Sequence, residues 1–240
     1  MKIFALLCAF ASGVLFGCAF RLLPEPWLCD YGETPRACHA PQCRRLPVWQ
    51  LLLFGTLCTV CTAGAMAQLQ GTFSLFLFAM LVGVLLLAAL CDARYTILPD
   101  ELLLLGSVLA LLLYFGGALQ NMQPMWYMPL LGALLGFFGL WGVLWLASKI
   151  YHTDAIGFGD VKLLALLGFL CGPAGLGVAV LLAVLSAALV CVPLLLLKKI
   201  KRTDAFPFGP FLVGGALCAL CAWQPWHNLL TWYFGLFSSI

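Results

Sequence analysis

The sequence Gly157-Phe158-Gly159-Asp160 stands at the start of an apolar run that extends to Leu197 and is interrupted at Cys171-Gly172-Pro173. Such a run is typical of helices that cross the roughly 30 Å of hydrocarbon in a bilayer. A carboxylate beside hydrocarbon is costly unless it is hydrated or paired, so Asp160 is a candidate functional residue. The two glycines before it allow another backbone to approach closely, which side chains would prevent.

Similar apolar runs recur along the whole chain of 240 residues, which is 64% hydrophobic and 9% charged. Soluble domains carry about 25% charged residues, so this composition indicates an all-α, polytopic bundle of membrane helices in contact with lipid. We predict about eight transmembrane helices, at residues 3–22, 48–68, 72–91, 101–118, 127–148, 160–171, 174–197 and 207–224. The aromatic stretch 223–240 is typical of an interfacial tail. A net charge of +3 gives no indication of a nucleic-acid partner.

The amino terminus has some features of a signal peptide, with Lys2, an apolar stretch and Ala9-Phe10-Ala11 as a cleavage sequence. The apolar run nevertheless continues past that sequence, and Arg21 follows it as an interfacial anchor would. We therefore expect residues 1–22 to form a retained first transmembrane helix. A small cytoplasmic insert at 23–47 and a membrane-embedded domain at 48–240 would complete the chain.

The charges are placed asymmetrically with respect to the eight predicted crossings. The loops at 23–47, 92–100, 149–159 and 198–206 fall on one side, and with the adjoining helix ends they hold every basic residue except Lys2. All nine acidic residues lie on the same side. Basic loops remain in the cytoplasm, so we predict that this side is cytoplasmic and that both termini are non-cytoplasmic.

Twelve cysteines are present, and most of them lie inside apolar runs, where cysteine behaves as a small hydrophobic residue. Two sequences, Cys58-Thr59-Val60-Cys61 and Cys218-Ala219-Leu220-Cys221, have the Cys-x-x-Cys spacing of redox motifs. Neither lies near a βαβ pattern, so we interpret both as packing residues.

A second aspartate, Asp92, ends the apolar run at Ala89-Leu90-Cys91-Asp92, and a bundle can bring it to Asp160. Two aspartates hydrolyse a peptide when one is protonated, the other is ionised and both share a water molecule. Like charges a few ångströms apart favour that division, since the second ionisation is disfavoured. Structural alternatives remain at this point: Asp160 as a helix N-cap and Asp92 as a solvated loop residue. Asp100-Glu101 after Pro99 is typical of a helix start.

Four segments resemble the bacterial prepilin peptidases, a family of aspartyl proteases. Asp92-Ala93-Arg94-Tyr95-Thr96-Ile97-Leu98-Pro99-Asp100 resembles their first catalytic motif, and Gly157-Phe158-Gly159-Asp160-Val161-Lys162-Leu163-Leu164 is similar to the second. Phe206-Pro207-Phe208-Gly209-Pro210-Phe211 resembles the segment that opens their last helix. Gly13-Val14-Leu15-Phe16-Gly17 with Arg21-Leu22-Leu23-Pro24 is similar to their first helix. The resemblance spans nearly the whole chain in the right order.

The resemblance implies an enzyme of the bacterial inner membrane that removes the short basic leader from type IV prepilins or type II secretion pseudopilins at the cytoplasmic face. Asp92 and Asp160 would be the catalytic pair, and no cofactor would be needed for cleavage. Gly157 and Gly159 would let the substrate backbone lie close to the carboxylates. Lys162 matches the lysine of the second motif and would either steady the ionised pair or extend toward the interface.

The insert at 23–47 departs from the family pattern. Many members carry paired Cys-x-x-Cys motifs there, which are tied to zinc and to methylation of the new amino terminus. Here Cys29, Cys38, His39 and Cys43 are present without such pairs. A Cys3His zinc site is one interpretation of these four residues. Methylation with S-adenosylmethionine as the methyl donor stays open.

Two other functions are weighed against this resemblance. Presenilin-like and signal-peptide-peptidase-like proteases also use Gly-x-Gly-Asp, but they carry a Tyr-Asp first motif and a late Pro-Ala-Leu motif, neither of which stands at the corresponding position here. A small proton-coupled transporter would place its carboxylates near the bilayer midplane, often in repeated halves. Both aspartates here fall at one predicted interface, and the sequence shows no repeat.

Overall fold

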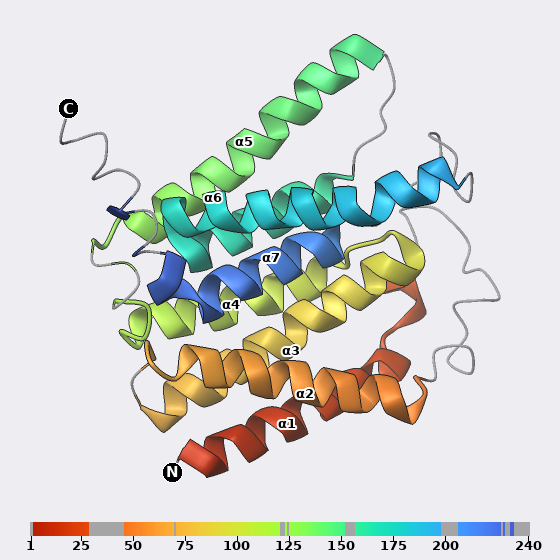
Figure 1. Cartoon of the computed structure of the whole chain (residues 1–240). Coiled ribbons are helices and arrows are strands. Elements are labelled where there is room, and N and C mark those ends of the chain that lie inside the picture. The colour runs from red at the N-terminus through yellow and green to blue at the C-terminus, as the bar shows by residue number, and fades with distance from the viewer. Residues whose placement is uncertain are drawn as a thin grey trace.

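The computed structural model describes residues 2–28, 46–69, 71–120, 123, 125–151, 157–197, 206–226, 228 and 231–232, and the structural statements below concern these residues. They form helices and connections with no strand among them, which confirms the all-α fold (Figure 1). The elements are α1 Lys2–Ala19, the short 3-10 helices η1 Phe20–Leu22 and η2 Glu25–Leu28, α2 Val48–Ala65, α3 Thr72–Tyr95, α4 Asp100–Phe115, α5 Met128–Tyr151, α6 Phe158–Leu196 and α7 Gly209–Cys221. Five spans in the described part are long and apolar enough to cross a membrane: Lys2–Leu22, α2, α3, Met128–Leu146 and α6.

Helix α6 is broken at Gly172, where φ is 67° and ψ is 177°. This left-handed conformation favours glycine. Pro173 has no backbone N–H, so the carbonyl of Phe169 loses the partner that an uninterrupted helix would supply. The buried side chain of Gln123 replaces it, because its Nε2 donates to the carbonyls of Phe169 at 3.1 Å and Leu170 at 2.7 Å. The prediction of two helices separated by Cys171-Gly172-Pro173 is therefore confirmed.

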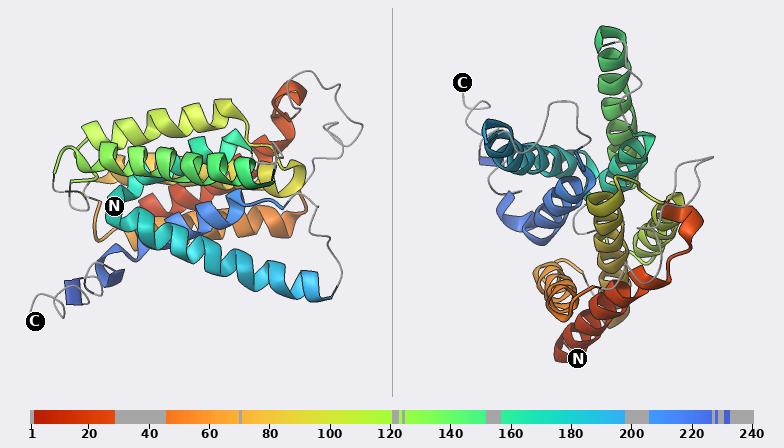
Figure 2. Two further views of the ribbon diagram at one scale, coloured as in Figure 1. Left: turned by 90° about the horizontal axis from the view of Figure 1, so that it is seen from above. Right: turned by 90° about the vertical axis from the view of Figure 1, so that its right-hand side faces the viewer.

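The two halves of α6 double back on each other, and the helical segments alternate in direction along the bundle (Figures 1 and 2). The start of α1 and the end of α7 lie together at one end, which we call the terminus end. We call the opposite end the charged end, because it carries the described charged residues other than Lys2. These are Arg21, Glu25, Asp92, Arg94, Asp100, Glu101, Lys149, Asp160 and Lys162.

Several predicted boundaries need correction, and the end of α3 matters most. This helix continues to Tyr95 instead of ending at 91, so Asp92 lies inside its last turns and not in a loop. Thr96 ends the helix with a left-handed φ of 55°, and its N–H donates to the Asp92 carbonyl at 2.8 Å. The chain then reaches Pro99, which restricts the residue before it to extended conformations and fixes the short connection to α4.

Two residues at the start of the predicted interfacial tail have defined contacts. The ring of Trp223 lies 3.1 Å from the position that a Cβ on Gly175 would take, and Trp226 is partly buried against the core. These two aromatic residues therefore pack on the bundle.

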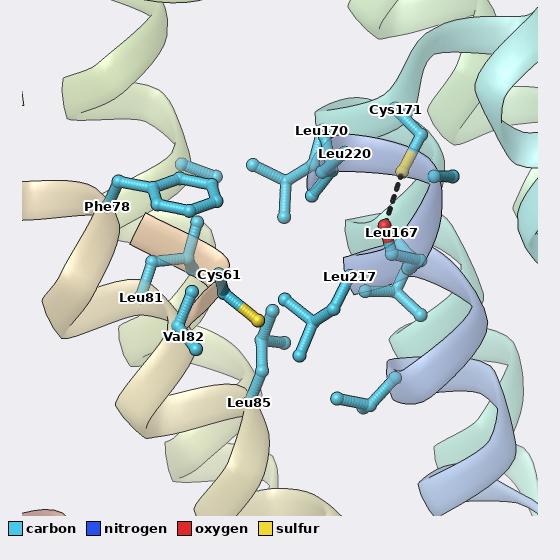
Figure 3. Packing of buried hydrophobic residues seen from close by; sticks show 14 of the residues in the cluster. Cys61, Phe78, Leu81, Val82, Leu85, Leu167, Leu170, Cys171, Leu217 and Leu220 are labelled. Carbon is cyan, nitrogen blue, oxygen red and sulfur yellow. Dashed lines mark hydrogen bonds between the residues drawn. The ribbon is translucent and has the colours of Figure 1, made fainter. Parts of the chain in front are cut away.

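Small residues allow the closest helix contacts. The backbones of α5 and α6 meet at Gly132 and Gly168, where a Cβ on either residue would collide with the carbonyl of the other. Such contacts are typical of membrane bundles, in which close packing replaces the hydrophobic driving force between helices. Larger side chains fill the centre between α2, α3, α6 and α7 (Figure 3). They include Cys61, Phe78, Leu81, Val82, Leu85, Leu167, Leu170, Leu217 and Leu220.

Candidate active site

Asp92 is a buried carboxylate at the charged end of α3, with 6% of its surface exposed. Its Oδ2 accepts a hydrogen bond of 2.8 Å from the backbone N–H of Gly209, the first residue of α7. This bond joins helices that are 117 positions apart in sequence. A backbone donor at a helix start is well suited to a carboxylate, because the N–H groups there have no partner within the helix.

Asp160 lies in the first turn of α6, at the same charged end of the bundle as Asp92. The two carboxyl groups are near enough for their charges to interact. Its Oδ1 is buried, and it has no hydrogen-bond partner among the described residues. An N-cap would precede the helix and would bond to a backbone N–H, whereas Asp160 is inside α6 and no side-chain cap bond is present there. The geometry therefore favours the paired-carboxylate interpretation over the capping one.

Position 209 requires a glycine because the backbone there is in close contact with Asp92. A Cβ at this position would lie 2.7 Å from Asp92 Oδ2 and 3.1 Å from its Cγ, distances at which something must move. Phe206 and Phe211 stack at 5.4 Å between ring centroids on either side of this helix start. The sequence alone did not predict a role for Gly209. The glycine followed by Pro210 at the start of an apolar run was the available signal.

The two motif glycines have different surroundings. A Cβ on Gly159 would meet Leu98 Cβ at 3.0 Å, so this glycine lets the connection between α3 and α4 pack against the start of α6. Gly157 is exposed, and no atom lies within 4 Å of its Cβ position. Open space for a bound backbone is therefore found beside Gly157, while Leu98 occupies the space beside Gly159.

Lys162 does not contact the aspartate pair. Its Nζ lies 2.6 Å from Asp100 Oδ2, and it also lies over the ring of Phe158, 5.3 Å from the centroid. Asp100 begins α4, as predicted, and its ion pair with Lys162 joins the starts of α4 and α6. The two side chains are 38% and 55% exposed, so solvent screens the pair and its contribution to stability is small.

Arg94 ties the other helices to this end of the bundle. Its guanidinium lies over the ring of Phe20 at 5.2 Å and donates to Gln50 Oε1 at 3.1 Å. Phe20 in turn stacks on Tyr95. The first two helices are thereby anchored next to the turn that carries Asp92.

The four residues considered for zinc, Cys29, Cys38, His39 and Cys43, lie outside the described residues. Within the described part of the chain, no group of three or more His, Cys, Asp or Glu side chains is arranged to hold a metal ion.

Comparison with known proteins gives consistent matches. A family described as "Type IV leader peptidase family" matches residues 79–192, a range that includes both aspartates. A prepilin leader peptidase/N-methyltransferase of Aeromonas hydrophila is 32% identical over 211 residues, which cover 86% of this chain and 67% of that protein. The protein with the same name from Pseudomonas aeruginosa is 30% identical over 227 residues, covering 84% and 77% of the two chains.

The chain belongs to the type IV leader peptidase family.

A third relative, from Xanthomonas campestris pv. campestris, is 38% identical over 125 residues, which cover 50% of this chain and 41% of that protein. No solved structure matches the chain. Family membership makes the protein a membrane peptidase and confirms the family named from the sequence. It also removes the presenilin-like and transporter alternatives. The residues that match the family do not include Gly209, which lies after residue 192.

Proposed function

We propose that this type IV leader peptidase is an aspartyl endopeptidase in which Asp92 and Asp160 activate one water molecule between them. Its substrates would be type IV prepilins or type II secretion pseudopilins, which lose their basic leader at the cytoplasmic face of the bacterial inner membrane. The observation that carries the proposal is that two largely buried carboxyl groups, from α3 and α6, lie within range of each other's charge at the charged end of an otherwise apolar bundle.

The hydrogen bond from Gly209 distinguishes the roles of the two aspartates. The N–H of Gly209 stabilises negative charge on Asp92, because hydrogen bonds to ionised groups are stronger than neutral ones. Asp92 is therefore the base that takes a proton from the attacking water. Asp160 holds the shared proton and donates it to the carbonyl oxygen of the scissile peptide.

This assignment also accounts for the buried Oδ1 of Asp160. A buried polar atom without a partner costs about 1–3 kcal/mol. The catalytic water and the substrate carbonyl are the groups that would pair with it during the reaction. Asp92 then gives the proton taken from water to the peptide nitrogen, and the C–N bond breaks. A hydroxyl of the tetrahedral species returns a proton to Asp160, so the pair is again singly protonated.

The surroundings of the pair fit a substrate that has a charged leader followed by an apolar helix. The open side of Gly157 offers space for an extended backbone next to Asp160. The charged end keeps a basic leader in water while the apolar helix of the substrate lies against the bundle. The scissile bond, at the junction between the basic leader and the apolar helix of the substrate, would then lie at the level of the aspartates.

The test is processing of a co-expressed prepilin by Asp92→Asn and Asp160→Asn variants. Each substitution keeps the size of the side chain and removes its ability to share a proton, so leader removal should fall by about 10³-fold or more for either variant. Glu101→Gln is the matched control, because Glu101 is an exposed carboxylate in the first turn of α4 and should leave cleavage unchanged. Cleavage near the wild-type rate by either aspartate variant, at equal expression, would reject the proposal.

The names of the relatives favour a second activity, transfer of a methyl group from S-adenosylmethionine to the new amino terminus. Most of the insert associated with this activity, residues 29–45, lies outside the described residues. Mass spectrometry of mature pilin, produced with and without S-adenosylmethionine, tests it directly, and an unmethylated product in both samples would reject it. Replacing Cys29, Cys38 and Cys43 with Ser should leave leader removal within a few-fold of wild type.

A further inference from the structure

The two Cys-x-x-Cys sequences, which the peptidase site does not use, meet in the folded chain. The Cys221 thiol donates a hydrogen bond of 3.3 Å to the carbonyl oxygen of Cys61. The helices touch one turn further along α2, where a Cβ on Gly64 would lie 2.8 Å from Cys221 Cβ. A cysteine of α2 and a cysteine of α7 are thus direct neighbours, although they are 160 positions apart in sequence.

The pair lies at the terminus end of the bundle. Cys221 is the last residue of α7, and Cys61 is in the last turns of α2, which ends at Ala65. The charge asymmetry predicts that this end faces away from the cytoplasm. Disulfides form and persist in such compartments, whereas cytoplasmic thiols are kept reduced.

The neighbouring cysteines are less suited to this contact. Cys58 is fully buried, and the thiol of Cys171 points to the carbonyl of Ala216 at 3.9 Å (Figure 3). Cys218 is exposed, and it makes no hydrogen bond to α2 in the described part of the chain. Cys221 is half-buried and therefore reachable, while Cys61, at 7% exposure, is held in place by the core. Thiol–disulfide exchange depends on access, so Cys221 is the thiol that an external disulfide can reach, and Cys61 is the neighbour that can then attack it.

We propose that Cys61 and Cys221 form a redox-active pair that closes to a disulfide between α2 and α7. The oxidant is a low-molecular-weight or protein disulfide. The Cys221 thiol attacks this disulfide, forms a mixed disulfide and releases one thiol of the oxidant. The Cys61 thiol then attacks the Cys221 sulfur of the mixed disulfide and releases the second. The S–S bond of the oxidant is broken, the Cys61–Cys221 bond is formed, and both protons end on the released thiols.

Closure of the bond would fix α7 at the end opposite to the aspartates. The 13 residues of α7 span about 20 Å between Cys221 and Gly209, whose N–H holds Asp92. A disulfide at one end of this helix therefore restricts the element that positions a site residue at the other end. The inference itself does not depend on the peptidase proposal, because the pair and its test are separate from the aspartates.

The test uses the full-length protein in detergent, treated with oxidised or reduced glutathione and then with a maleimide polymer that shifts the electrophoretic mobility of free thiols. Oxidised wild type should have two fewer reactive thiols than the reduced protein, and a reductant should restore them. Peptide mapping of the oxidised wild type should identify a Cys61–Cys221 linked peptide. The oxidised form should also unfold at a temperature roughly 5 °C or more above that of the reduced form.

Variants separate this pair from the other thiols. Cys61→Ser and Cys221→Ser should abolish the oxidant-dependent shift, whereas Cys58→Ser and Cys171→Ser should keep it. Mapping of the wild type decides the question even where a variant does not fold. A linked peptide that contains Cys218 with Cys221, or Cys58 with Cys61, would overturn the inference. Full reactivity of both thiols after oxidation would overturn it as well.

Discussion

Gly209→Ala is the substitution that tests the site geometry most directly. It adds one methyl group at the start of α7, where a Cβ would lie 2.7 Å from Asp92 Oδ2. Ordinary contact begins at 3.4 Å, so the helix start and the carboxylate must separate by about 0.7 Å. The hydrogen bond of 2.8 Å between the Gly209 N–H and Asp92 would then be stretched to the limit of hydrogen bonding.

The expected decrease in kcat can be estimated from the loss of that hydrogen bond. A hydrogen bond to a charged group contributes about 1.5–3 kcal/mol, and each 1.4 kcal/mol is a factor of about ten. Displacement of a catalytic group by almost 1 Å costs about 10²-fold by itself. We therefore expect kcat for leader cleavage to fall by about 10²-fold. KM should stay within a few-fold, because Gly209 contacts the carboxylate and not the substrate.

The assay is cleavage of a purified prepilin by the enzyme in detergent, with kcat and KM measured separately. Gly214→Ala is the matched control: it makes the same change in the same helix, and no atom lies within 4 Å of its Cβ position. It should keep wild-type kinetics. Unfolding temperature should be measured for both variants, so that a folding defect is distinguished from a catalytic one. If Gly209→Ala folds normally and cleaves within two-fold of wild type, the role assigned to this N–H is wrong.

Three further predictions concern the surroundings of the site. In a double-mutant cycle with Asp100→Asn and Lys162→Gln, the coupling in the free energy of unfolding should be about 0.2–1 kcal/mol, because both side chains are partly exposed. A much larger coupling would show that solvent does not screen this ion pair. Thr96→Gly should keep cleavage, since glycine tolerates a φ of 55°. Thr96→Pro should abolish folding or activity, since proline fixes φ near −65° and removes the N–H that ends α3. Equal activity of the two variants would contradict this role of Thr96. Reporter fusions after Gln120 and Lys201 should report from opposite sides of the membrane, with Lys201 in the cytoplasm, and a periplasmic signal from Lys201 would defeat the predicted topology.

The sequence was sufficient to predict the order of the long helical segments in the part of the chain that the structure describes. Each apolar run is long enough to require burial of its backbone polar groups, and in lipid a helix is the local solution to that requirement. The break in α6 could be predicted for the same kind of reason, because Gly172-Pro173 cannot continue a regular helix whatever surrounds it. Ends of helices were less predictable: α3 continues through Asp92 to Tyr95, where the left-handed Thr96 and the connection to α4 stop it.

The candidate pair, Asp92 and Asp160, could be named from the sequence, because a carboxylate next to an apolar run is costly and therefore seldom incidental. Their partners could not be named in this way. The bond from Gly209 to Asp92, the pairing of Lys162 with Asp100 and the contact between Cys61 and Cys221 each join residues from helices that are distant in the chain. Hydropathy defines which segments are buried but not which faces of two helices meet. That choice depends on close packing of small residues across the whole bundle, and it is decided only in the tertiary structure.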